Sequence, residues 1–228
     1  MVSTIKKAPL CKRSFVEALG TFIFVFLGAG SAIAASYAGL GGSALLAVAF
    51  ANGIGLALAI SFAMNISGGH INPAVTIAAF INKLISTKDA IIYIIAQIVG
   101  ATLAGILLVA IFPALLGTMV HYGAPTLGSG VSVVTGITLE AIMTLFLVLM
   151  VFGTIVDQRA PKMAGFGVGL IVVIDVLVGG AFTGAAMNPA RAIGPMIASG
   201  FFANWYVYWI GPIIGAVIAA VIYKYIIK

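Results

Sequence analysis

Two short polar segments repeat in a chain that is otherwise strongly apolar. Asn72-Pro73-Ala74 lies in the first half, and Asn188-Pro189-Ala190 lies in the second half. Asn is a strong helix N-cap, and Pro suits the first helical position because its missing N–H would be unpaired there. We therefore predict that a helix begins at each Asn-Pro, with the Asn amide beside the positive end of the helix dipole. Two such amides could donate hydrogen bonds to the oxygen of a passing neutral molecule.

Four charged residues fall within or beside apolar stretches: Arg191, which directly follows the second Asn-Pro-Ala, and Glu17, Glu140 and Asp175. Charged groups at membrane depth are costly and usually functional. Arg191 would repel cations, and its guanidinium would donate to water or to a solute hydroxyl. For Asp175 we favour a structural hydrogen bond, with a subunit contact and the pore wall as alternatives.

The composition identifies an integral membrane protein. Of 228 residues, 63% are hydrophobic and 7% charged, whereas a soluble domain carries about a quarter charged residues. One cysteine and two distant histidines exclude a disulfide framework and favour no metal site. The chain also has no Ser/His/Asp set, no metal-ligand spacing and no phosphate loop, so we predict no cofactor and no enzyme activity.

Hydropathy predicts six membrane spans within one domain, residues 1–228. A span needs about twenty apolar residues, and such stretches lie near 14–36, 43–64, 89–112, 132–156, 165–182 and 205–227. The longest connection runs from about 113 to 131. Two further segments, 66–82 and 183–199, are too short to span and are interrupted by Gly and Asn-Pro. Such segments point to half-helices that enter the membrane and turn back.

The basic residues predict the orientation of the chain. They flank alternate connections and both ends: Lys6, Lys7, Lys12, Arg13, Lys83, Lys88, Arg159, Lys162, Lys224 and Lys228. Because Lys and Arg are retained in cytoplasmic loops, we expect a multi-pass protein of the cell membrane with both termini in the cytoplasm. This distribution leaves no basic surface for nucleic acid.

The two halves of the sequence align with each other. The offset is 123 from Glu17 to Glu140, 116 from Asn72 to Asn188 and 115 from Tyr93 to Tyr208. Repeat one would cover about 14–112 and repeat two about 132–227. With three spans each, the second copy enters the membrane from the opposite side, so the two half-helices should approach each other from opposite faces.

The repeated segments resemble the signature boxes of a known family. Ser67 to Thr76 (SGGHINPAVT) and Met187 to Arg191 (MNPAR) are similar to the two boxes of the aquaporin, or major intrinsic protein, family. The resemblance includes Glu17, Gln97 and Glu140 and covers nearly the whole chain. It implies an all-α membrane fold of six helices and two half-helices, one pore per monomer, and assembly as a homotetramer.

The resemblance also implies a second constriction built from four positions. The second-helix position is Asn52, the fifth-helix position is Val176, and the half-helix loop contributes Ala185 and Arg191. Strict water channels resemble each other in having an aromatic residue at the first position and His at the second. This chain has Asn52 and Val176 there, so its filter should be wider.

Other markers favour water over glycerol. Glycerol facilitators of this family have Asp directly after the Arg and a basic residue four positions further on, where this chain has Ala192 and Met196. The pair Tyr208-Trp209 looks like the water-channel pattern.

For Glu17 and Glu140 the resemblance implies a structural role: the carboxylates accept hydrogen bonds from the backbone of the half-helix loops. Two residues before Asn72, His70 lies in a loop that must pack inside protein, which favours a structural histidine over a pH sensor.

The leading hypothesis is a passive channel for water that excludes protons and ions. Glycerol, urea, ammonia and hydrogen sulfide stay open as further permeants. The alternatives are a glycerol and small-solute facilitator of the same family, a secondary transporter, for which no ion-coupling cluster is present, and an adhesive membrane protein. The short chain, with little outside its apolar core, suggests a prokaryotic or archaeal source.

Overall fold

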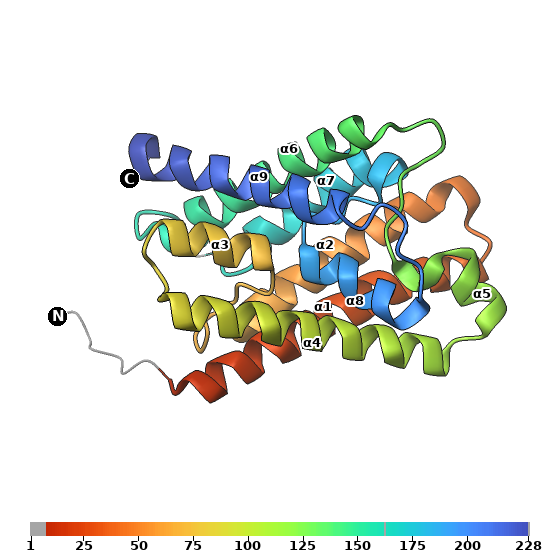
Figure 1. The fold of residues 1–228 in the computed structure, drawn as a ribbon, viewed down its shortest axis with the longest axis horizontal. Coiled ribbons are helices and arrows are strands. Elements are labelled where there is room, and N and C mark those ends of the chain that lie inside the picture. The colour runs from red at the N-terminus through yellow and green to blue at the C-terminus, as the bar shows by residue number, and fades with distance from the viewer. Residues whose placement is uncertain (1–7, 162, 228) are drawn as a thin grey trace.

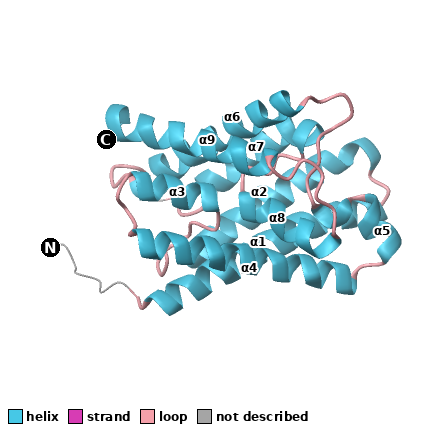
Figure 2. Ribbon diagram, viewed as in Figure 1, coloured by secondary structure: helices cyan, strands magenta, loops and turns pink. Residues whose placement is uncertain are grey.

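The computed structural model describes residues 8–161 and 163–227, and within them every regular element is helical (Figure 2). Lys6, Lys7, Lys162 and Lys228, which contribute to the predicted orientation, lie outside the described residues. Six helices in the described part of the chain are long and apolar enough to cross a membrane. This confirms the all-α membrane fold expected from the sequence.

The long helices are α1 (Leu10–Tyr37), α2 (Ala44–Ala63), α4 (Thr87–Ile111), α6 (Val133–Val151), α7 (Phe166–Thr183) and α9 (Val207–Ile222). A π-helical turn, Phe152–Val156, continues α6, and another, Tyr223–Ile227, continues α9. The two half-helices are α3 (Pro73–Ile81) and α8 (Pro189–Ser199). The spans therefore lie within a few residues of their predicted limits.

Two local features differ from the sequence prediction. The first helix begins at Leu10, one turn early, because Arg13 is held in place: its guanidinium lies 2.8 Å from the Asp89 carboxylate of α4 and also donates to the Ala8 carbonyl. The connection between α4 and α6 is also not a plain loop. It contains the short helix α5 (Ala114–Met119) and a 3-10 turn, His121–Gly123.

The helices pack as two related halves (Figure 1). In the first half α1 packs on α2 and α4, and in the second half α6 packs on α7 and α9. Helices α2 and α7 join the halves. Each half-helix crosses over, since α3 packs on α9 and α8 packs on α4. The half-helices consequently lie in the middle of the bundle, and the described ends of the chain lie at one end of the molecule (Figure 1).

Glycines allow the long helices to approach closely, as is common between membrane helices. At the crossing of α2 and α7, a Cβ on Gly53 would overlap the Gly169 carbonyl oxygen, and a Cβ on Gly169 would overlap the Gly53 carbonyl oxygen. Gly100 lies in the same way against the Ala18 carbonyl of α1. These contacts bring the helices close enough to enclose the half-helices without a wide gap.

We expect Gly53→Ala to destabilise the fold. The added methyl group would meet backbone atoms that cannot rotate away, and overpacking of this kind costs about 1–3 kcal/mol, against a gain in helix propensity of about 1 kcal/mol. Thermal unfolding in detergent should show a lower midpoint. Gly55→Ala on the same helix is the matched control, because its Cβ would lie 3.5 Å from the nearest atom, in ordinary contact. Equal midpoints for both variants would contradict the close approach.

Candidate pore and selectivity filter

Both half-helices begin as the sequence predicts. Asn72 and Asn188 are the N-caps, with Pro at the first helical position. The Oδ1 of Asn72 accepts from the Ala74 N–H at 2.8 Å, and that of Asn188 accepts from the Ala190 N–H at 3.0 Å. Each cap satisfies a backbone donor that the helix itself leaves unpaired.

The residue before each Asn has a left-handed backbone. Ile71 has a φ of 55° and Met187 a φ of 52°. For a non-glycine residue, and above all for a β-branched one, this conformation is strained and persists only when its surroundings impose it.

The two loops hold each other across the centre of the bundle. The Nδ2 of Asn72 donates to the Met187 carbonyl at 2.9 Å, and the Nδ2 of Asn188 donates to the Ile71 carbonyl at 2.9 Å. These reciprocal bonds use one N–H of each amide. Since an Asn amide carries two N–H groups, each Asn keeps a second donor for another acceptor.

A buried carboxylate supports each loop from behind. Glu17 accepts from the backbone N–H groups of His70 and Ile71, at 2.9 and 2.6 Å, and from the side chains of Ser67 and Gln97. The side chain is fully buried. A carboxylate is well suited to this position because it accepts several hydrogen bonds and donates none.

Glu140 holds the second loop in the same way but with fewer donors. It accepts from the N–H groups of Ala186 and Met187, at 2.9 and 2.7 Å, and from the Thr183 hydroxyl at 2.7 Å. The position that corresponds to Gln97, at an offset of 115, is Pro212, which has no side-chain donor. The second loop is therefore supported by three hydrogen bonds where the first has four.

His70 packs beside the first loop. Its Nδ1 lies 3.1 Å from the Thr76 hydroxyl, and Gln97 donates to that same hydroxyl at 3.0 Å. The imidazole also meets the edge of the Tyr93 ring. These contacts fix the ring between the half-helix and α4.

A small cavity of about 10 Å³ lies where the half-helices meet. Four of the predicted pore residues line it: Asn52, Asn72, Ala185 and Asn188. The rest of its wall is mainly apolar and comprises Phe24, Leu56, Leu147, Val172, Ala186 and Met187. This is about the space that one water molecule needs, and the three Asn residues bring the only side-chain amides of its wall.

Arg191 and Val176 do not line this cavity. Arg191 is 8% exposed and donates from Nη1 to the Gly123 carbonyl at 3.1 Å. No carboxylate among the described residues lies within 4.0 Å of its guanidinium, so the positive charge is not neutralised by direct pairing. Val176 is buried on α7, one turn after the cavity-lining Val172.

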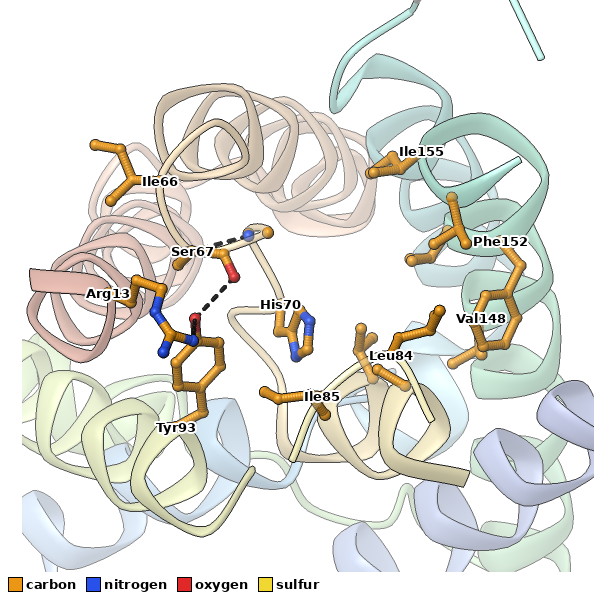
Figure 3. Close-up of a pocket in the computed structure, with 16 residues that line it drawn as sticks. Arg13, Ile66, Ser67, His70, Leu84, Ile85, Tyr93, Val148, Phe152 and Ile155 are labelled. Atoms are coloured by element: carbon orange, nitrogen blue, oxygen red, sulfur yellow. Dashed lines mark hydrogen bonds between the residues drawn. The ribbon is translucent and has the colours of Figure 1, made fainter. Parts of the chain in front are cut away.

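A larger pocket of about 370 Å³ opens toward the end of the molecule that holds the described chain ends. We call it the terminal-side vestibule. Figure 3 shows two unlike walls, with Arg13, Ser67 and Tyr93 on one side and Val148, Phe152 and Ile155 on the other. The His70 imidazole lies between them (Figure 3). The vestibule thus leads to the loop that carries Asn72.

Asp175, Tyr208 and Trp209, all noted in the sequence, each have a buried side-chain atom without a hydrogen-bond partner among the described residues. Asp175 is 3% exposed, and its Oδ2 finds no hydrogen-bond partner among the described residues. The hydroxyl of Tyr208 is likewise without one. The structural hydrogen bond expected for Asp175 is therefore not present at Oδ2.

Sequence reasoning missed several residues that build the site. Ser67 and Thr183 both reach a buttressing carboxylate, and the Gly123 carbonyl holds Arg191. Ser67 and Thr183 are separated by 116 residues, the offset of the two Asn-Pro-Ala segments, so the internal alignment could have found them. Nothing in the sequence marks Gly123, because any residue could supply that backbone carbonyl.

Comparison with known proteins decides the family. The model of the major intrinsic protein family matches residues 4–223. The chain belongs to the major intrinsic protein family. This family consists of channels, not enzymes, and the chain is accordingly a multi-pass membrane protein.

Relatives in the major intrinsic protein family span nearly the whole chain. The chain is 42% identical to aquaporin TIP4-4 of Zea mays, over 93% of this chain and 86% of the relative, and 42% identical to the probable aquaporin TIP3-2 of Arabidopsis thaliana, over 95% and 84%. The suggestion of a prokaryotic or archaeal source is wrong on this comparison, since these relatives are plant proteins. A chain with few residues outside its apolar core does not indicate its source.

The X-ray structure of the aquaglyceroporin from Plasmodium falciparum shares the fold. Its TM-score is 0.82 at 23% identity, with 96% of this chain and 97% of that chain covered. At this identity the match supports the shared fold of the major intrinsic protein family and nothing finer.

We expect Glu140→Gln to destabilise the second loop. The amide retains one acceptor oxygen but turns two N–H donors toward groups that themselves donate, and the loss of hydrogen bonds to a charged buried group costs about 1.5–3 kcal/mol. The midpoint of thermal unfolding in detergent should fall by several degrees.

Asp157→Asn is the matched control for this carboxylate-to-amide change. Asp157 pairs with Arg159 in the connection between α6 and α7, and ion pairs at the surface contribute little. If Glu140→Gln melted at the wild-type temperature, the buttress would not hold the loop.

Proposed function

We propose that this protein is a passive channel that conducts water and excludes protons and ions. The single observation that carries the proposal is the reciprocal pair of Asn72 and Asn188 at the junction of two half-helices. Two further observations support it. The relatives of this chain are named aquaporins, and the small central cavity has room for about one water molecule.

The junction selects against cations by electrostatics. Each half-helix N-terminus is equivalent to roughly half a positive charge, and both face the same point. The full positive charge of Arg191 lies in the first turn of the second half-helix, α8. A cation that enters this narrow path would lose its hydration and gain no compensating carboxylate, so its barrier is high.

The junction also interrupts proton transfer along water. The spare N–H of each Asn amide donates to the oxygen of a water molecule, which turns both water hydrogens away from the pair. Apart from Asn52, which brings one further side-chain amide, the rest of the cavity wall is mainly apolar. A water so oriented accepts no hydrogen bond from its neighbours at that point, and the hydrogen-bonded chain that protons need is broken.

The filter proposed around Arg191 is wider than one restricted to water. Asn52, Val176 and Ala185 are all small or medium side chains, so we propose that small neutral solutes also pass. A dedicated glycerol facilitator is less supported, because the relatives found by sequence are named aquaporins. Ala192, directly after Arg191, agrees with water as the main permeant.

The proposal extends to the domain organisation, the oligomeric state and the orientation of the chain in the membrane. The chain would form one domain with repeats of about 14–112 and 132–227, and a homotetramer in the cell membrane, with both termini cytoplasmic. Support for the orientation is that the basic residues Lys12, Arg13, Lys83, Lys88 and Arg159 all fall on one side of the predicted spans. Neither a metal nor another cofactor has a part in the proposed mechanism.

Osmotic shrinkage of liposomes tests the function. Purified protein is reconstituted, and light scattering is followed after a sucrose step and then after a glycerol step, with empty liposomes as the reference. We expect shrinkage much faster than the reference with a low activation energy, and reswelling in glycerol slower than the water phase. Shrinkage no faster than that of empty liposomes would overturn the proposal.

We expect Arg191→Val to admit protons while water still passes. Removal of a fixed positive charge lowers the electrostatic barrier, and proton leak should rise by about tenfold or more, which corresponds to ~1.4 kcal/mol. A pH-sensitive dye inside the liposomes measures the leak. Arg159→Val, which removes an exposed arginine outside the spans, is the control and should leave the leak unchanged. An identical leak in both variants would contradict the role of Arg191.

A further inference from the structure

Asn52 occupies an unusual position within the cavity wall. The amide Nδ2 donates to the Val48 carbonyl, one turn earlier on α2, at 2.8 Å. This bond folds the side chain back along its own helix. Although Asn52 lines the central cavity, only 3% of the residue is exposed.

The space that receives this folded side chain comes from one glycine on α1. A Cβ placed on Gly28 would overlap the Asn52 Oδ1 and would lie 2.9 Å from its Cγ. Real Cβ atoms do not approach other atoms so closely, so the amide has its present place only because residue 28 has no side chain.

The second repeat provides an internal comparison. At the offset of 123 that relates Glu17 to Glu140, Gly28 corresponds to Val151, which lies in α6. At the offset of 116, Asn52 corresponds to Val168 of α7, which is fully buried. The helix at this position therefore accepts a β-branched residue. The glycine is therefore tied to the Asn52 side chain of its own half, and not to the geometry of the helix.

A methyl group at residue 28 would force the Asn52 amide to move, and the packing decides the direction. The next residue, Gly53, is in backbone contact with α7, which blocks movement of α2 on that side. The remaining free space beside Asn52 is the central cavity that it already lines. An amide moved there would give up its bond to Val48 and narrow the pore.

We propose that Gly28 is a positioning residue that sets the width of the pore at Asn52, because it leaves room for the amide to fold back along α2. It touches no permeant itself and acts through the Asn52 side chain. This inference rests on the proposed channel function and goes beyond it, because it assigns a determinant of solute size to a residue outside the pore wall.

The test is a double-mutant cycle in liposomes. Gly28→Ala should lower water permeability by about tenfold, and urea permeability by more than that, because urea is wider. In the Asn52→Ala background the same Gly28→Ala change should have no effect on either permeability, because the side chain that it displaces is gone. A purely structural effect of the methyl group on α1 would persist in both backgrounds.

Gly30→Ala is the matched control. It is two residues away on the same helix, and its Cβ would lie 3.3 Å from the flexible end of Leu108, so its permeabilities should equal those of the wild type. If Gly28→Ala fails to fold, the double variant should fold, because truncation of Asn52 relieves the overlap. A double variant that also fails to fold would overturn the inference.

The remaining outcomes separate this inference from the proposed function. Wild-type liposomes that shrink no faster than empty ones would overturn both. Two outcomes would overturn the role of Gly28 alone. One is a conducting wild type with a Gly28→Ala variant of unchanged permeability. The other is a Gly28→Ala change that lowers permeability equally with and without the Asn52 side chain.

Discussion

The structure depends on one constraint: irregular backbone at membrane depth must find its hydrogen-bond partners inside the protein. The loops that precede α3 and α8 are irregular, and both lie in the middle of the bundle. Glu17 and Glu140 satisfy their N–H groups from behind, and the two Asn side chains satisfy carbonyls from in front. With those groups satisfied, the strained residues before each Asn can keep their left-handed conformation.

The same arrangement creates the site. Because the loops use most of their own polar groups to support one another, few side-chain donors face the cavity. These are the spare N–H groups of Asn72 and Asn188 and the second N–H of Asn52 on α2. A selective path results from what the loops leave unpaired. The rest of the wall is mainly apolar, so these amides are the side chains that orient a passing molecule.

Internal symmetry explains the construction but not the selectivity. Carboxylate, loop, Asn cap and half-helix occur in both halves with nearly the same contacts. The differences are local. Pro212 stands at the position of Gln97, and Arg191 has no counterpart in the first half. Val151 and Val168 stand at the positions of Gly28 and Asn52. Of these departures, Arg191 and Asn52 belong to the proposed filter, where a channel must distinguish one permeant from another.

The sequence by itself determined the class of protein, the six spans, the two half-helices and the residues at their starts. These follow from local physical chemistry, because hydropathy over about twenty residues and the capping behaviour of Asn-Pro depend on neighbours in the chain. The internal offsets further related the two halves to each other.

Only the tertiary structure decided how distant groups meet. The reciprocal bonds between Asn72 and Asn188 link residues more than a hundred positions apart, and the Gly123 carbonyl that holds Arg191 belongs to a connection with no sequence signal. The folded-back position of Asn52 against Gly28 is also invisible to periodicity, because it depends on how closely α1 and α2 cross. Side-chain direction and helix separation are set by packing between elements, and no local pattern encodes them.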